Sequence, residues 1–262
     1  MERRETQGLG FVTGKWPLDP DQPTIVFIHG AGGAYGIWES QVESLSELVN
    51  TVALNLPGHG NSGGTGKRTI TEYAQAVIEF IDAIGAPAPI PCGISMGGAI
   101  TQQLLVDYPQ RFPAGILIST GAKLKVMPAI FETIENDYSG FVAMIVKAAA
   151  SAQTDPERLK SFREEIAGCR PEITFGDFEA CHRFDETQRL SQIKVPVLII
   201  TAEDDKLTPP KYGDFLAKEI KNASRAHLKQ AGHIVPLEKP DEVSQAIREF
   251  LERWRSHFRK RA

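Results

Sequence analysis

A serine between glycines is the strongest chemical signal in the sequence. Ser95 stands in the segment Gly93-Ile94-Ser95-Met96-Gly97-Gly98, a G-x-S-x-G pattern that follows a short strand-like run and precedes a helix-like run over residues 99–108. In a sharp strand-to-helix turn, glycines two positions before and after the serine avoid a collision of side chains. Such a turn exposes the serine Oγ above a sheet and leaves the N–H of Met96 at a helix start, where it can stabilise an oxyanion. Taken alone, the pattern also fits an accidental glycine-rich turn.

Four further segments place polar residues after strand-like runs. Residues 27–33 read F-I-H-G-A-G-G, residues 55–62 read N-L-P-G-H-G-N-S, residues 201–209 read T-A-E-D-D-K-L-T-P, and Gly232-His233 precedes the last helical run. Together with the serine segment, and in this order, they resemble the α/β-hydrolase superfamily over nearly the whole chain. The chain departs from the family pattern at Asn55, where aspartate is usual, and at Ala202, where glycine is usual. The first departure concerns a loop and not the catalytic residues.

The resemblance implies a catalytic triad of Ser95, Asp205 and His233, in the chain order of this fold. A serine hydroxyl is a weak nucleophile, so the imidazole of His233 would take its proton and later return it to the leaving group. The carboxylate of Asp205 would orient the imidazole and stabilise its cation. The backbone N–H groups of Ala31 and Met96 would form the oxyanion hole.

The triad acid has two candidates, because Asp204 and Asp205 are neighbours. Asp205 lies four residues before Pro209, the spacing of the D-x-x-x-P pattern in the resembling family, and we prefer it. Asp204 stays the alternative, with a solvated loop charge as its other interpretation. Of the remaining histidines, His29 and His59 are expected to be hydrogen-bonded residues that shape their loops and not proton carriers.

No cofactor or metal site is predicted. Gly66-Lys67 lies in a glycine-rich stretch, but a phosphate-binding P-loop would require glycine at Asn61 and serine or threonine at Arg68. Gly30-Ala31-Gly32 follows a strand-like run, but the third glycine of a dinucleotide fingerprint falls on Tyr35. Metal-ligand spacings such as H-E-x-x-H or C-x-x-C do not occur.

Short apolar runs that alternate with helical periodicity must position these residues. The strand-like runs are residues 24–28, 51–56, 115–119, 195–200 and 226–229, and helical stripes cover residues 37–48, 70–84 and the run from Pro240 onward. Continuous apolar strands that alternate with helices indicate a mostly parallel sheet flanked by helices. The predicted fold class is therefore α/β, and the resemblance specifies the α/β-hydrolase fold. Thr69 and Glu72 have the spacing of a capping box at the start of one helix.

The alternation stops near residue 121 and resumes near residue 190. The intervening segment predicts helices without strands, so we expect an inserted helical cap over residues 121–190. The catalytic core would then comprise residues 1–120 and 191–262. Most of the apolar side chains of the cap are expected to form its own core, with the rest lining a pocket over the serine. The four considered are Phe131, Phe141, Met144 and Ile145.

The strand that leads to Ser95 contains Pro89 and Pro91, which lack the N–H donor that a central strand uses. Because the two prolines are two positions apart, both would lose the bond to the same neighbouring strand. We therefore expect this strand to be short or irregular on one side.

Composition places the chain among ordinary globular proteins. With 262 residues and a net charge of −4, it is long enough for a large core and too acidic to suggest a nucleic-acid partner. Its three cysteines show no paired spacing, which fits a reducing compartment. The start lacks an apolar signal region, and no apolar run reaches the roughly 18 residues of a membrane span. We therefore expect a cytoplasmic protein without a membrane partner. The basic run from Arg253 to Lys260 should be a solvated helix end. The sequence leaves the oligomeric state open.

These observations predict a serine hydrolase that cleaves a small to medium, mostly apolar carboxylic ester through an acyl-enzyme. The apolar insertion, which lacks a cluster of basic residues for a phosphate or CoA handle, favours such a small-molecule substrate. Carbon–carbon bond hydrolysis, lactonase, acyltransferase and perhydrolase activities fit the same residues. Because the nucleophile is serine and not aspartate, haloalkane dehalogenase and epoxide hydrolase chemistry is disfavoured. An alternative of another class is a ligand receptor that turns its signal molecule over slowly.

Overall fold

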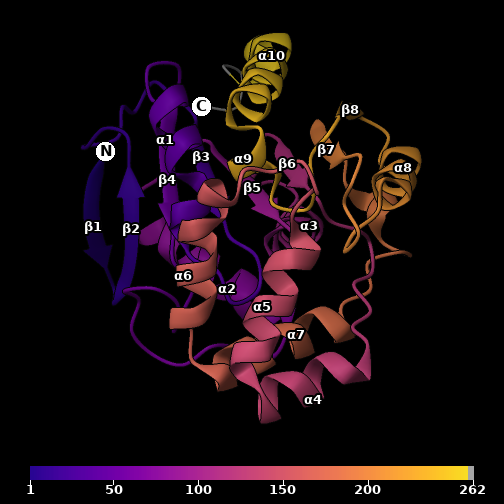
Figure 1. The fold of residues 1–262 in the computed structure, drawn as a ribbon. Coiled ribbons are helices and arrows are strands. Elements are labelled where there is room, and N and C mark those ends of the chain that lie inside the picture. Colours follow the sequence, from indigo (N-terminus) through magenta and orange to yellow (C-terminus); the bar gives the residue numbers. More distant parts are fainter. Residues whose placement is uncertain (259–262) are drawn as a thin grey trace.

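An eight-stranded sheet, with strand order β1-β2-β4-β3-β5-β6-β7-β8, runs through the computed structural model, which describes residues 1–258 and the side chains of residues 1–254 (Figure 1). The strands are β1 (Glu2–Thr6), β2 (Leu9–Thr13), β3 (Thr24–Ile28), β4 (Asn50–Leu54), β5 (Pro89–Ile94), β6 (Gly115–Ile118), β7 (Val197–Ala202) and β8 (Ala223–Leu228). From β4 to β8 all neighbours are parallel, which confirms the predicted mostly parallel sheet.

The antiparallel hairpin of β1 and β2 at one sheet edge is the part of the sheet that the sequence analysis missed. The charged residues of β1 are largely exposed, so the strand carries no continuous apolar run. β2 pairs with β4 through the register Phe11↔Leu54 to Thr13↔Val52, and its side chains are buried by packing with distant segments, such as Phe11 against Phe80. A pattern that depends on a partner strand is weak in the sequence itself.

Helices cover both faces of the sheet. The α-helices are α1 (Glu39–Leu45), α2 (Ile70–Ala83), α3 (Met96–Asp107), α4 (Pro128–Asn136), α5 (Tyr138–Ala149), α6 (Lys160–Gly168), α7 (Pro171–Arg183), α8 (Pro210–Glu219), α9 (Val235–Glu238) and α10 (Pro240–Phe258); the 3-10 helices are η1 (Tyr35–Trp38), η2 (Pro156–Leu159) and η3 (Leu190–Gln192). Because side chains alternate along a strand, Phe27 of β3 packs in the cluster that holds α1 and α10. Its neighbour Ile28 packs in the cluster that holds α2, α3 and α8.

Helices α2 and α10 begin as the sequence predicts. The Thr69 hydroxyl accepts the N–H of Glu72 at 3.2 Å and donates to the Glu72 carboxylate at 2.7 Å, which is the capping box at the start of α2. α10 begins at Pro240, as predicted. The basic end of α10 that was expected to be solvated lies, from Arg255 on, outside the side chains that the structure describes.

Strand β5 is paired unequally on its two sides, as its prolines predict. It pairs with β3 from Pro89 to Gly93. It pairs with β6 only from Cys92 to Ile94, beyond both prolines. The strand that leads to Ser95 is therefore held along its length by β3 and at its carboxyl end by both neighbours.

The segment between β6 and β7 adds no strand to the sheet within the described chain; its one β-bridge joins Lys123 to Asp185. It carries α4, α5, α6 and α7, which gather in the lower half of Figure 1, away from α10. The division of the chain at residues 121 and 190 into core and cap stays a prediction. Among the described residues, no helix is both long and apolar enough to cross a membrane.

Candidate active site

Ser95 lies at the sharp turn from β5 to α3, in the left-handed region at φ 55° and ψ −117°. The turn requires its glycines. A Cβ on Gly93 would lie 1.9 Å from the carbonyl oxygen of Gly97, and one on Gly97 would lie 2.2 Å from that of Ile28. Both obstacles are backbone atoms that cannot swing aside, so the predicted steric reason for the G-x-S-x-G spacing is confirmed.

His233, in the loop between β8 and α9, is held by Asp205. Nδ1 of His233 lies 3.0 Å from Oδ2 and 3.1 Å from Oδ1 of the carboxylate, and both residues are buried. The hydroxyl of Thr208, a residue that the sequence analysis did not single out, donates to Asp205 Oδ2 at 2.8 Å and lies 3.1 Å from the same nitrogen. Burial opposes ionisation of Asp205, but His233 and the hydrogen bonds from Thr208 outweigh it, so the pKa of Asp205 is lowered.

Asp204, the alternative triad acid, has another partner. Its Oδ2 accepts the Ser151 hydroxyl at 2.5 Å, and its backbone N–H donates to the carbonyl of Ala231 at 2.8 Å. The geometry therefore brings Asp205, and not Asp204, to His233.

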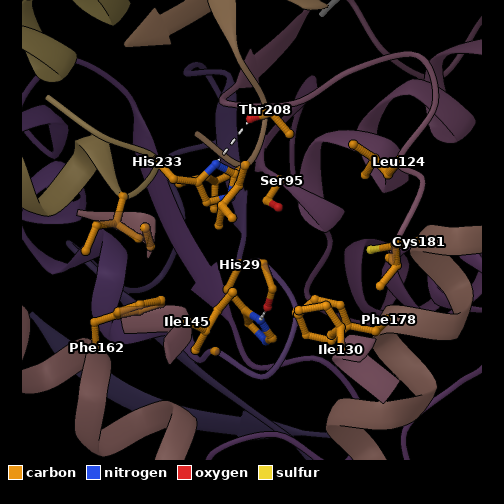
Figure 2. A pocket seen from close by; sticks show the side chains of 18 of the residues that line it. His29, Ser95, Leu124, Ile130, Ile145, Phe162, Phe178, Cys181, Thr208 and His233 are labelled. Carbon is orange, nitrogen blue, oxygen red and sulfur yellow. Dashed lines mark hydrogen bonds between the residues drawn. The ribbon is translucent and has the colours of Figure 1, made fainter. Parts of the chain in front are cut away.

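Ser95 and His233 line one cavity, and Figure 2 shows their side chains close together in its upper part, with the bond between His233 and Thr208 dashed. Ser95 follows β5, Asp205 follows β7 and His233 follows β8. These three strands are parallel, so their carboxyl ends meet at one edge of the sheet, where ligands bind in open α/β sheets.

Ala31 and Met96, the two expected oxyanion donors, lie in segments next to the serine, and their role stays a prediction. Met96 opens α3, so its N–H is one of the orphan donors of a helix start, and Ala31 follows Gly30, which lies against the Ser95 side chain. His29 stabilises the start of the loop that carries Gly30 and Ala31. The N–H of Leu56 donates to its Nε2 at 3.0 Å, so Nδ1 carries the ring proton and donates to the carbonyl of Gly30 at 2.8 Å. Burial, together with the neighbouring His59, places the pKa of His29 well below its ordinary value. His29 is a neutral structural residue, as expected.

A buried ion pair that the sequence analysis missed lies next to this loop. Nε2 of His59 lies 2.8 Å from Oδ2 of Asp177 on α7, and Nδ1 lies 3.1 Å from the carbonyl of Pro57. A ring that donates from both nitrogens is a cation. Burial opposes that cation, but the Asp177 carboxylate more than offsets it, so the pKa of His59 is raised. The hydroxyl of Tyr73 also donates to Asp177.

Glu165 on α6 is a second acidic residue that the sequence analysis missed, and it lines the cavity. Its carboxylate accepts the backbone N–H of Ala34 at 3.2 Å. Burial raises the pKa of Glu165 to about 7, against the opposing effect of its hydrogen bonds to the backbone of Ala34 and Gly36. Nothing local in the sequence distinguishes Glu165 or Asp177 from the solvated acids of the same helices.

The cavity has a volume of about 310 Å³ and is lined mainly by apolar side chains. The insertion contributes Leu124, Val126, Met127, Ile130, Ile145, Ala149, Phe162, Phe178 and Cys181, most of them labelled in Figure 2. Of the four side chains considered in the sequence, Phe141 is fully buried and Phe131 packs against Phe175. Ile145 lines the cavity, and Met144 is exposed.

Within the part of the chain that the structure describes, no three His, Cys, Asp or Glu side chains are grouped so that they could hold a metal ion. The polar and charged side chains that line the cavity include those of Ser95, His233, Glu165, Lys125, Lys206, Thr208 and Tyr212.

Comparison with known proteins identifies the family. Residues 25–246 match the model of the alpha/beta hydrolase family. The chain belongs to the alpha/beta hydrolase family. The resemblance seen in the sequence motifs is thus confirmed, and so is the predicted fold class, because the eight-stranded, mostly parallel sheet flanked by helices is the fold of its structural relatives.

Relatives within the alpha/beta hydrolase family include lactonases and esterases. The chain is 26% identical over 242 residues to 3-oxoadipate enol-lactonase 2 of Acinetobacter baylyi, covering 89% of this chain and 90% of the relative. It shares its fold with the enol-lactonase from Burkholderia xenovorans LB400, at a TM-score of 0.86 and 23% identity, covering 96% of this chain and all of the other. A thermophilic esterase is 29% identical at a TM-score of 0.80, covering 96% and 97% of the two chains.

Proposed function

We propose that the protein hydrolyses a small to medium, mostly apolar carboxylic ester through an acyl-enzyme on Ser95. The observation that carries the proposal is the contact of His233 Nδ1 with Asp205 at 3.0 Å, beside the cavity that both Ser95 and His233 line. When Nδ1 donates to the carboxylate, Nε2 is the unprotonated nitrogen and is free to act as a base.

The residues divide the reaction into two steps. Nε2 of His233 takes the proton of the Ser95 hydroxyl while Oγ attacks the carbonyl carbon, and the N–H groups of Ala31 and Met96 stabilise the resulting oxyanion. The imidazolium then gives its proton to the departing alkoxide, which leaves as the alcohol. Water, deprotonated by the same nitrogen, then attacks the acyl carbon; the bond to Ser95 Oγ breaks, Oγ takes the proton back from the imidazolium, and the acid is released. Asp205 keeps the imidazole in the required tautomer throughout.

A lactone is the second candidate substrate, and one of the relatives favours it. The curated relative from Acinetobacter baylyi is named as an enol-lactonase and resembles this chain over nearly its full length. A lactone is a cyclic ester, so the same residues would open it, and the alcohol would stay attached to the acyl group. The similarity to a thermophilic esterase at 29% identity favours the open-chain ester.

A substrate panel tests the proposal. Purified protein and Ser95→Ala would be assayed with p-nitrophenyl acetate and butyrate, with alkyl lactones and with a vinylogous diketone, and labelled with a fluorophosphonate. We expect a burst of p-nitrophenol, steady turnover of one ester class and labelling of Ser95, all lost in the variant. Stoichiometric modification without turnover would favour the receptor alternative, and an unlabelled, inactive protein would refute the hydrolase proposal.

A further inference from the structure

The loop that carries the oxyanion donor Ala31 is hydrogen-bonded to two carboxylates of the insertion. The N–H of Gly32, the next residue, donates to Oδ2 of Asp177 at 2.7 Å. Two positions further, the N–H of Ala34 donates to Oε2 of Glu165 at 3.2 Å. The same carboxylate is within hydrogen-bond reach of the N–H of Gly36. Asp177 lies on α7 and Glu165 on α6, so neither belongs to the strand and loop that they contact.

The loop also lies closely against these helices. A Cβ on Gly36 would lie 2.1 Å from Oε1 of Glu165. Gly32 adopts φ 66°, and a Cβ there would lie 3.3 Å from side-chain atoms of both Ile166 and Thr174. Glycine at these two positions lets the backbone of the loop lie this close to α6 and α7.

Asp177 is itself fixed from the core. It is fully buried, and its two oxygens receive the ring N–H of His59 and the hydroxyl of Tyr73 in addition to the N–H of Gly32. It is absent from the walls of the cavity, so it does not contact a substrate there. An effect of Asp177 on catalysis would therefore pass through the residues that it binds, and of these Gly32 is the one next to Ala31.

We propose that Asp177 and Glu165 are positioning residues that hold the loop of residues 31–36 in the geometry that aims the N–H of Ala31 at the oxyanion. The inference rests on the proposed function, in which Ala31 is an oxyanion donor. Oxyanion stabilisation needs the donors at about 2.7–3.1 Å from the developing charge, and small displacements are costly in rate. The insertion thus does more than line the cavity, because it completes the catalytic geometry of the core.

The test compares kcat and KM of Asp177→Ala, Asp177→Asn and Glu165→Ala with those of the wild type. Ser95→Ala gives the background rate without the nucleophile. Alanine removes the acceptor of the Gly32 N–H, and we expect kcat to fall about 10- to 100-fold with KM within about twofold, since the interaction is used only in the transition state. Asparagine keeps a carbonyl acceptor at that place and should restore most of kcat. Glu165→Ala should lower kcat about tenfold.

A second readout separates loop geometry from stability. An alkyl trifluoromethyl ketone adds Ser95 Oγ to its carbonyl and forms an oxyanion adduct, so its Ki should rise in parallel with the fall in kcat, whereas the Ki of the free carboxylic acid product should not change. The matched control is Glu186→Gln, which alters a buried carboxylate of the same insertion that pairs with Arg189 and not with the loop. It should leave kcat and both Ki values unchanged.

The outcomes distinguish the two proposals. If Ser95→Ala keeps wild-type hydrolysis, the proposed function is wrong. If Ser95→Ala is inactive but the folded Asp177 and Glu165 variants keep wild-type kcat and ketone affinity, the proposed function stands and the positioning role is refuted. If Asp177→Ala does not fold, the other two variants decide. The role is supported if Asp177→Asn keeps kcat while Glu165→Ala, which changes a residue of the cavity wall, loses kcat and ketone affinity but keeps the Ki of the acid product. Unchanged kcat and ketone affinity in both variants, or a product Ki that rises in Glu165→Ala as much as the ketone Ki, overturns it.

Discussion

Asp204 and Asp205 are adjacent in sequence, yet the first binds the hydroxyl of Ser151 at 2.5 Å and the second binds His233 at 3.0 Å. Asp204 thereby connects the segment after α5 to the loop after β7 that carries both aspartates, and Asp205 orients the imidazole. A third acid, Glu238 on α9, accepts the N–H groups of Gly232 and Ser151. The loop of His233 is therefore held by Asp205 on one side and by Glu238 on the other.

Exchange of each aspartate for asparagine should separate these roles. Asp205→Asn should lower kcat by about 10⁴, because an amide facing Nδ1 favours the wrong imidazole tautomer. Asp204→Asn keeps an oxygen for Ser151 and should lower kcat less than about tenfold. The measurement is kcat on p-nitrophenyl butyrate, with folding checked by circular dichroism. A large loss in Asp204→Asn alone would reverse the assignment of the triad acid.

Glu238→Gln tests the second attachment of the His233 loop. Both carboxylate oxygens receive the N–H of Gly232, at 3.0 and 2.9 Å, and Oε2 also receives that of Ser151 at 3.0 Å. The amide of glutamine turns one acceptor into a donor, so we expect a loss of about 1–3 kcal/mol in the free energy of unfolding. Urea denaturation measures it. The control is Glu242→Gln on α10, an exposed side chain, which should stay within about 0.5 kcal/mol.

The proposed catalytic residues could be predicted from the sequence because their constraints are mostly local. The glycines around Ser95 serve a single turn, and Asp205 follows a strand with a recognisable apolar run, β7. His233 follows β8, which has no such run, and was found from the Gly-His pair before the last helix. Pro89 and Pro91 likewise predicted that their strand is irregular on one side, since proline lacks a donor wherever it stands. The structure shows that this is the side of β6.

The residues that the sequence did not identify depend on contacts between distant segments. Asp177 meets Gly32 across 145 positions, and Glu165 meets Ala34 across 131. An acid on a helix is normally solvated, and only the packing of α6 and α7 on the loop distinguishes these two. The hairpin of β1 and β2 was missed for a related reason, because β2 pairs with β4 and packs against residues that are distant in sequence.

Glu165 should make the stability of the protein depend on pH near neutrality. Its pKa in the folded protein is about 7, above the ordinary value of 4.5. The folded state therefore binds the proton more tightly than the unfolded state, so stability should fall as pH rises from about 4.5 to about 7 and level off above that. Glu165→Gln removes this contribution. Urea unfolding at about pH 5 and about pH 8 should show a smaller difference for this variant than for wild type.

The control for this pH effect is Glu164→Gln, which changes the exposed neighbour on the same helix. It should keep the wild-type difference between the two pH values. If wild type and Glu165→Gln show the same difference in stability between the two pH values, the Glu165 carboxyl has the same pKa in the folded and unfolded protein, contrary to this prediction.

Gly97→Ala tests the steric basis of the serine turn. The new Cβ would lie 2.2 Å from the carbonyl of Ile28 and 2.7 Å from that of His29, both backbone atoms of β3 and its loop. The turn must deform, so we expect a loss of kcat of at least about 100-fold, since displacements near 1 Å already cost that much. Gly168→Ala is the control, because nothing lies within 4 Å of its Cβ position. That variant should keep full fluorophosphonate labelling, and full labelling in Gly97→Ala would contradict the steric argument.

The cavity should set the preferred length of the acyl group, and Ile145 is the position to test because it lines the cavity from α5. Ile145→Phe adds bulk inside a volume of about 310 Å³. One methylene in an apolar pocket changes kcat/KM by about 10- to 200-fold, so octanoate esters should lose at least about tenfold relative to acetate esters. Met144→Phe, at the exposed neighbouring position, should leave the ratio unchanged. If both variants shift the ratio equally, the acyl group binds elsewhere, because only one of these side chains faces the cavity.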